Sequence, residues 1–215
     1  MTSPLVHHTP VASERVLALL APALREPGAV LVDATVGLGG HSRMALDRFP
    51  AIRVIGIDRD PEALEIAAER LSASRERVHL VHTVFDEIPS VLADLGIACA
   101  DGVLFDLGVS SKQLDEARRG FSYAQDSELD MRMNPGDVLT AADVVNDYAE
   151  EDLVRILRQF GEEKFAPRIA RGIVRAREGH RVSRSSELVS IVKEAIPAAA
   201  RRRGGNPAKR TFQAL

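Results

Sequence analysis

Short runs of β-branched and aliphatic residues alternate with longer, more polar stretches along the first half of the chain. Four runs have the length and composition of strands buried on both faces of a sheet: residues 30–32, 53–58, 78–81 and 102–106. Four stretches before and between them are predicted as helices: residues 11–24, 41–48, 61–71 and 88–95. This alternation is typical of parallel βαβ units, so the sequence predicts an α/β fold of the Rossmann-like type.

The second half of the chain has a different pattern. Residues 107–133 are polar, contain glycines and lack periodicity, which predicts a long ordered loop over one edge of the sheet. Four further helices are predicted after it: residues 141–148, 151–160, 166–177 and 186–196. A helical part therefore follows the strand-bearing part.

A glycine turn follows the first strand. Asp33 closes that strand, and Gly37, Gly39 and Gly40 come before the next helix. Glycines allow positive φ and let a ligand approach the backbone closely. Ser42 stands where the dinucleotide fingerprint has its third glycine, and an acid four positions before the first glycine is more typical of S-adenosylmethionine sites than of NAD sites. The turn predicts a cofactor site, with a plain tight turn as the alternative.

A second acid follows at the end of the next strand. Asp58 lies 19 residues after Gly39, close to the offset of roughly 20 residues at which a carboxylate reaches the ribose of a bound nucleoside. The alternative role for Asp58 is the N-cap of the helix that starts at Pro61, although Asp60 suits that role better. We therefore favour the ribose contact.

Two more residues are placed at the same edge. Phe85, just after the third strand, either covers one face of an adenine ring or belongs to the core. Asp106 stands at the carboxyl end of the fourth strand, where it would line the ligand-binding edge together with Asp33 and Asp58. Three carboxylates suit a ligand with hydroxyls and amines and would repel a triphosphate, and no Gly-Lys-Ser/Thr of a P-loop is present.

Composition narrows the class of protein. The chain has 215 residues, of which 45% are apolar and 27% charged, enough for one large domain or a domain with an insertion. No run approaches the roughly 18 to 20 apolar residues of a membrane span, and the start lacks the pattern of a signal peptide, so we expect a cytoplasmic protein with no membrane contact.

The single cysteine, Cys99, excludes a disulfide scaffold or cysteine zinc site, and we expect it to be buried.

Charge is distributed unevenly. Residues 1–150 hold 13 Lys and Arg against 24 Asp and Glu, a balance of −11, whereas residues 151–215 hold 15 against 7, a balance of +8. A basic segment attracts a polyanion, and the alternative is a set of solvated helix faces. The cluster Arg201 to Arg203, followed by Lys209 and Arg210, favours nucleic acid.

Several motifs give a close resemblance to a known family. They are HTPV (8–11), the turn at 33–42, DLGVSS (106–111), RGFS (119–122), LDMRM (129–133), GEEKFA (161–166) and RTFQA (210–214). With these motifs the chain resembles the ribosomal RNA small subunit methyltransferase H family over nearly its whole length. The resemblance implies an S-adenosylmethionine-dependent enzyme that methylates the N4 amine of a cytidine in the decoding region of 16S rRNA in the small ribosomal subunit. No DNA partner and no metal are expected.

The resemblance also implies site residues. Matched position by position, the family's cofactor contacts fall on Gly39, Gly40, His41, Asp58, Phe85, Asp106 and Gln113. Of these, His41 and Gln113 come from the resemblance alone. Asp106 is also our candidate to align the cytosine amine or accept its proton, although the motif Asp/Asn-Pro-Pro-aromatic of many amino methyltransferases is absent after it.

Four residues of the predicted loop have two possible roles each. Ser110 and Ser111 would either bond the target base or cap their own backbone. Phe121 and Tyr123 would either stack on a flipped cytosine or pack beneath the loop.

The resemblance sets the expected domains. Residues 1–114 would be the first part of the methyltransferase core, residues 115–205 the active-site loop and a helical insertion that recognises RNA, and residues 206–215 the start of the return to the core. The family continues beyond the last motif with further strands, so we expect an open sheet edge here. The alternative function is a truncated, catalytically idle module that binds cofactor or RNA, and an NAD-dependent oxidoreductase is disfavoured by the missing glycine.

Overall fold

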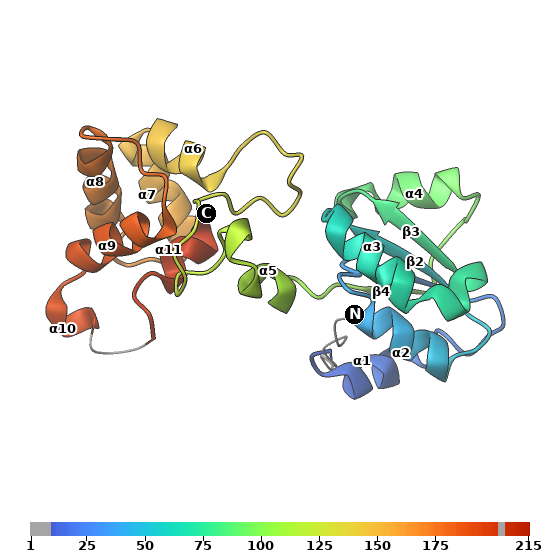
Figure 1. Cartoon of the computed structure of the whole chain (residues 1–215). Coiled ribbons are helices and arrows are strands. Elements are labelled where there is room, and N and C mark those ends of the chain that lie inside the picture. Colours follow the sequence, from blue (N-terminus) through green and yellow to red (C-terminus); the bar gives the residue numbers. More distant parts are fainter. Residues whose placement is uncertain (1–9, 202–204) are drawn as a thin grey trace, which may run out of the picture. The chain divides into compact units, whose positions relative to one another are not determined.

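The computed structural model describes residues 10–201 and 205–215 and contains two compact units, Met1–Gly108 and Val109–Leu215 (Figure 1). His8 and Thr9 of the first motif, and Arg202 and Arg203 of the basic cluster, lie outside the described residues. Among the described residues, no helix has both the length and the apolar character needed to cross a membrane.

The first unit is built on a four-stranded parallel sheet. Its strands are β1 (Val30–Asp33), β2 (Arg53–Asp58), β3 (Val78–His82) and β4 (Gly102–Leu104), in the order β3-β2-β1-β4. Every residue of β1 is buried, as expected of a central strand that helices cover on both faces. The Rossmann-like α/β prediction is confirmed.

The fourth strand is shorter than predicted. We expected it to run to Asp106, but it ends at Leu104. The physical reason is the side chain of Thr35, just after β1. The amide of Asp106 donates to Thr35 Oγ1 at 2.7 Å and therefore makes no strand-to-strand hydrogen bond with the backbone of β1. The hydroxyl therefore sets where Asp106 emerges from the sheet.

Helices pack against the sheet. They are α1 (Ser13–Leu20), α2 (Gly40–Arg48), α3 (Pro61–Arg70) and α4 (Ile88–Asp94), with the 3₁₀ turns η1 (Ser72–Arg77) and η2 (Phe85–Glu87). Three of the four helices lie within one residue of their predicted bounds. The helix predicted at 11–24 ends at Leu20, because Pro22 has no amide hydrogen to donate to the carbonyl of Ala18 and so interrupts the helical hydrogen bonds.

Cys99 contradicts the sequence prediction. We expected a buried thiol, but Cys99 is exposed. It lies in the irregular segment between α4 and β4, three residues before the strand begins, where Ile97 and Ala100 pack against an apolar cluster and Cys99 does not. The apolar residues around it were therefore a poor guide to its burial.

The second unit is helical. Its elements are α5 (Ser111–Asp115), η3 (Ala117–Arg119), α6 (Ala141–Asp147), α7 (Glu150–Gln159), α8 (Ala166–Arg177), α9 (Ser185–Ala195), α10 (Ala198–Arg201) and α11 (Lys209–Ala214). The four predicted helices are confirmed to within one residue at each end. One apolar core joins α6, α7, α8, α9 and α11, and Phe212, which we expected at the start of the return to the sheet, is buried in this core.

Candidate functional site at the carboxyl edge of the sheet

The glycine turn connects β1 to α2 and is tied to β2. The amide of Val36 donates to the carbonyl of Ile57 at 2.9 Å, so the turn is held over the neighbouring strand. Gly39 is the N-cap of α2 with φ 78°, a left-handed conformation that side chains disfavour. A Cβ at Gly40 would lie 2.6 Å from Cγ of Pro10, too close for any other residue without movement. Both predicted glycines are thus required by local geometry.

Asp58 is clamped against this turn by backbone amides. Its Oδ2 accepts from the amide of Gly37 at 2.8 Å, and its Oδ1 accepts from the amide of Asp60 at 2.9 Å. Burial raises the pKa of Asp58, and the two amide donors oppose that rise. The helix cap is Asp60, whose Oδ1 accepts from the amide of Glu62 at 3.1 Å, so the alternative role of Asp58 as the cap of α3 is wrong.

Asp33 lies beneath the turn and does not present its carboxylate at the edge. Only 1% of the residue is exposed, and its Oδ2 accepts a 2.6 Å hydrogen bond from Ser42 Oγ in the first turn of α2. Burial raises the pKa of Asp33 to about 6, with the Ser42 hydroxyl and His41 opposing the rise. The expectation that Asp33 lines the ligand edge is therefore corrected, because the carboxyl group fixes α2 to β1.

His41 and Asp106 approach each other above β1. His41 Nε2 lies 3.1 Å from the carbonyl of Val11, which can only accept, so Nε2 carries a proton. The other ring nitrogen, Nδ1, is 3.9 Å from Asp106 Oδ2. The imidazole is nearly buried while 52% of the Asp106 side chain is exposed, so the carboxylate reaches solvent from a fixed backbone.

Phe85 forms an open aromatic edge next to Asp106. Its ring packs edge to face on Phe105 with centroids 5.7 Å apart, and each residue is 48% exposed. The alternative that Phe85 belongs to the core is therefore wrong. Such a half-exposed aromatic pair leaves apolar surface available to a flat ring.

Gln113 is in the second unit, unlike the other six residues that the family matches. Its Oε1 accepts from the amide of Ser110 at 2.9 Å, and Ser110 Oγ accepts from the amide of Gln113 at 3.2 Å, which together make a capping box at the start of α5. Gln113 is 7% exposed. Of the two roles considered for Ser110, backbone capping is confirmed.

The aromatic residues of the predicted loop pack inward. Phe121 is buried, and Tyr123 lies edge to face on Phe212 with ring centroids 6.0 Å apart. Packing beneath the loop is therefore the confirmed alternative for both. Of the loop predicted at 107–133, residues 120–133 are irregular as predicted, whereas α5 and η3 lie within its first part.

Sequence reasoning missed two residues of the edge. Thr35 positions the amide of Asp106, and Phe105 supplies half of the aromatic pair with Phe85. Phe105 had the pattern of a buried strand residue, so nothing in the sequence signalled its exposure. Thr35 follows Asp33 by two positions, and a hydroxyl there is the only signal that could have indicated its role.

Comparison with known proteins gives one consistent family. A sequence model described as the MraW methylase family matches residues 5–215. Ribosomal RNA small subunit methyltransferase H of Parafrankia sp. (strain EAN1pec) is 59% identical over 210 residues, which are 98% of this chain and 64% of that protein. The protein of the same name from Frankia alni is 61% identical over 209 residues, 97% of this chain and 64% of that protein.

Similarity to solved structures is weaker. A rRNA methylase of Streptococcus thermophilus aligns with 53% of this chain and 67% of that chain at 22% identity and a TM-score of 0.35. The fold assignment therefore rests on the sheet of this chain. The chain spans 64% of the length of the two relatives above, so it corresponds to the larger part of those proteins.

Proposed function

The chain belongs to the MraW methylase family, and from that premise we propose that it methylates ribosomal RNA of the small subunit with S-adenosylmethionine as the methyl donor. The proposed target is the exocyclic N4 amine of a cytidine in the decoding region of 16S rRNA. The observation that carries the proposal is the edge where the glycine turn, the clamped Asp58, the open Phe85 ring and the exposed Asp106 carboxylate lie together in one unit. The cytoplasm is the proposed compartment.

The residues of this edge fit such a cofactor. Asp58 is held by backbone amides where a carboxylate can accept from ribose hydroxyls, and Phe85 offers apolar surface to an adenine ring. Gly39 and Gly40 keep the backbone at the start of α2 free of side chains. S-Adenosylmethionine, when bound, supplies an electrophilic methyl group on a sulfonium.

Asp106 is the proposed group that acts on the substrate amine. The lone pair of the cytosine amine is delocalised into its ring, so the nitrogen must be aligned and must lose a proton as its new bond forms. The Asp106 carboxylate is exposed while its amide is fixed by Thr35, which suits a group that accepts from N4–H and takes that proton. With saturating cofactor, Asp106→Asn should lower the rate of methyl transfer by about 10²-fold or more. An unchanged rate would refute the assignment.

The proposed partner is 16S rRNA within the small ribosomal subunit, and the basic segment 151–215 is the proposed contact. The direct test uses labelled S-adenosylmethionine and small subunits from cells that lack the modification, followed by mapping of the labelled base. Label on N4 of a decoding-region cytidine is the expected result. Label elsewhere refutes the proposed target, and bound cofactor without any transfer supports the idle binding module.

A further inference from the structure

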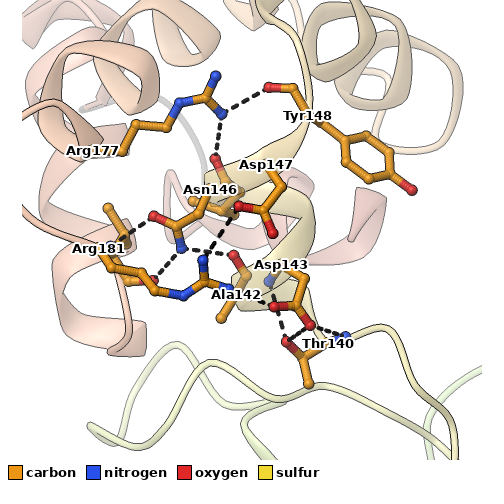
Figure 2. Close-up of polar contacts among 10 residues, drawn as sticks. Thr140, Ala142, Asp143, Asn146, Asp147, Tyr148, Arg177 and Arg181 are labelled. Atoms are coloured by element: carbon orange, nitrogen blue, oxygen red, sulfur yellow. Dashed lines mark hydrogen bonds and ion pairs between the residues drawn. The ribbon is translucent and has the colours of Figure 1, made fainter.

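The arginines of the second unit fall into two classes. Some donate to atoms of the unit itself, as Figure 2 shows for the last turn of α8 and the segment after it. Arg177 Nη1 donates to the carbonyls of Val145 and Tyr148 at 2.9 and 2.7 Å, where α6 ends. Arg181 bonds both Asp143 and Asp147. These two guanidinium groups fix α6 and are already engaged.

Three other arginines of α8 face away from the core. Arg168, Arg171 and Arg175 are exposed. At 3.6 residues per turn, Arg168 and Arg175 point in directions only about 20° apart, while Arg177 points about 180° from Arg168. The buried residues of α8 occupy the side of Arg177: Ala166, Ile169, Ala170 and Ile173. We call Arg168, Arg171 and Arg175 the arginine stripe.

Most of the charge of the arginine stripe is uncompensated. Within the described part of the chain, the side chains of Arg168 and Arg175 form no hydrogen bond and no ion pair. Arg171 has one partner, Glu150 Oε1 at 3.8 Å, in a pair that is largely exposed and therefore weak. The sequence of α8 itself contains four arginines and no carboxylate. A merely solvated helix face would be expected to mix both signs of charge.

We propose that the arginine stripe is a docking surface for phosphate groups of ribosomal RNA, an inference that rests on the proposed function. A guanidinium group recognises a phosphate through two parallel N–H donors. A guanidinium group without a partner in the protein can bind a phosphate without first breaking a hydrogen bond or ion pair. Arg168 and Arg175 are seven residues apart, which separates their Cα atoms by about 10 Å along the helix. A surface of this length contacts more than one phosphate of a folded RNA. The engaged Arg177 and Arg181 are excluded from it.

The test compares two double variants with equal loss of charge. Arg168→Gln/Arg175→Gln removes the two unpaired cations of the arginine stripe. Arg15→Gln/Arg25→Gln is the matched control, because these two side chains are also exposed and have no partner among the described residues, but they belong to the first unit. Binding to purified small subunits is measured against potassium chloride concentration. Loss of two phosphate contacts should weaken binding on the order of 20- to 60-fold at 0.1 M salt and reduce the slope of log K against log salt by about 1.4 to 1.8.

A third variant and a separate cofactor assay complete the experiment. Arg168→Lys/Arg175→Lys keeps the charges, so it should keep most of the salt slope, and all variants should bind S-adenosylmethionine as the unaltered protein does. If the glutamine variant of the arginine stripe binds subunits like the matched control, the inference is wrong while the proposed function stands. If the unaltered protein shows no salt-dependent binding to subunits, both are wrong.

Discussion

The ionisation of Asp33 should make the stability of the first unit fall as pH rises. Its pKa is raised from 3.8 to about 6 in the folded protein, chiefly by burial. Between these two values the folded state keeps a proton that the unfolded state has lost, so the stabilising contribution is complete below pH 3.8 and is lost as pH rises through about 6. At 1.36 kcal/mol per pKa unit, the loss amounts to about 3 kcal/mol.

Asp33→Asn should remove this pH dependence. Asparagine keeps an oxygen that can accept from Ser42 but cannot ionise, so the free energy of unfolding of the variant relative to the natural protein should rise by about 2.4 kcal/mol from pH 4 to pH 7.5. The quantity to compare is the change of this difference with pH, not its absolute value. The new amide group also lowers the free energy of unfolding by a pH-independent amount, because Oδ1 of Asp33 is buried and has no partner among the described residues.

The assay must report on the first unit alone. Both tyrosines of the chain, Tyr123 and Tyr148, are in the second unit, so their fluorescence serves as an internal reference for that unit. Urea unfolding of the first unit is followed through hydrogen exchange of the β1 amides. If the difference in free energy of unfolding between variant and natural protein stays constant from pH 4 to pH 7.5, the carboxyl group is not perturbed by burial.

A second variant tests the same carboxyl group. Ser42→Ala, which removes a donor that lowers the pKa of Asp33, should move the loss of stability to higher pH.

Three further variants test the site and the second unit. Phe85→Ala should weaken S-adenosylmethionine binding by about tenfold, measured by calorimetry, because an aromatic contact of about 1 kcal/mol or more is lost; equal affinity would refute the adenine contact. Gly40→Ala should lower the free energy of unfolding by about 1 to 3 kcal/mol, because the new methyl group overlaps the ring of Pro10. A melting temperature equal to that of the unaltered protein would contradict this. Asn146→Ala should destabilise the second unit by about 1 to 3 kcal/mol in tyrosine-monitored urea unfolding, because its side chain bonds both the amide and the carbonyl of Val182; an unchanged midpoint would count against that role.

The sequence was informative where one physical rule decides the outcome. The strands and most helices followed from apolar periodicity, and the position of Asp58 followed from its spacing to Gly39. It failed where a single side chain overrides the pattern. Thr35 draws the amide of Asp106 out of the ladder and shortens β4, and Ser42 draws the carboxylate of Asp33 under the turn. Such contacts depend on the three-dimensional fold, so no local sequence pattern predicts them.

The position of Gln113 shows a second limit of sequence reasoning. The family match placed it with the cofactor residues, yet the structure describes it in the second unit, in the cap of α5. A capping box is itself a readable pattern, since Ser110 stands three residues before Gln113. The family match alone could not say which of these roles accounts for the residue. The cofactor contact of Gln113 therefore stays a prediction.

The three carboxylates at the ends of β1, β2 and the segment after β4 differ in what their surroundings allow. Asp33 is buried and bonded to Ser42, so it holds the glycine turn in place. Asp58 has an amide donor on each oxygen, so its direction is fixed and each oxygen keeps a lone pair for a further donor. Asp106 alone combines a fixed backbone with a half-exposed side chain that can approach a substrate. Because a proton acceptor must be both positioned and reachable, these surroundings give Asp33 a structural role and favour the proposed binding role for Asp58 and the proposed reactive role for Asp106.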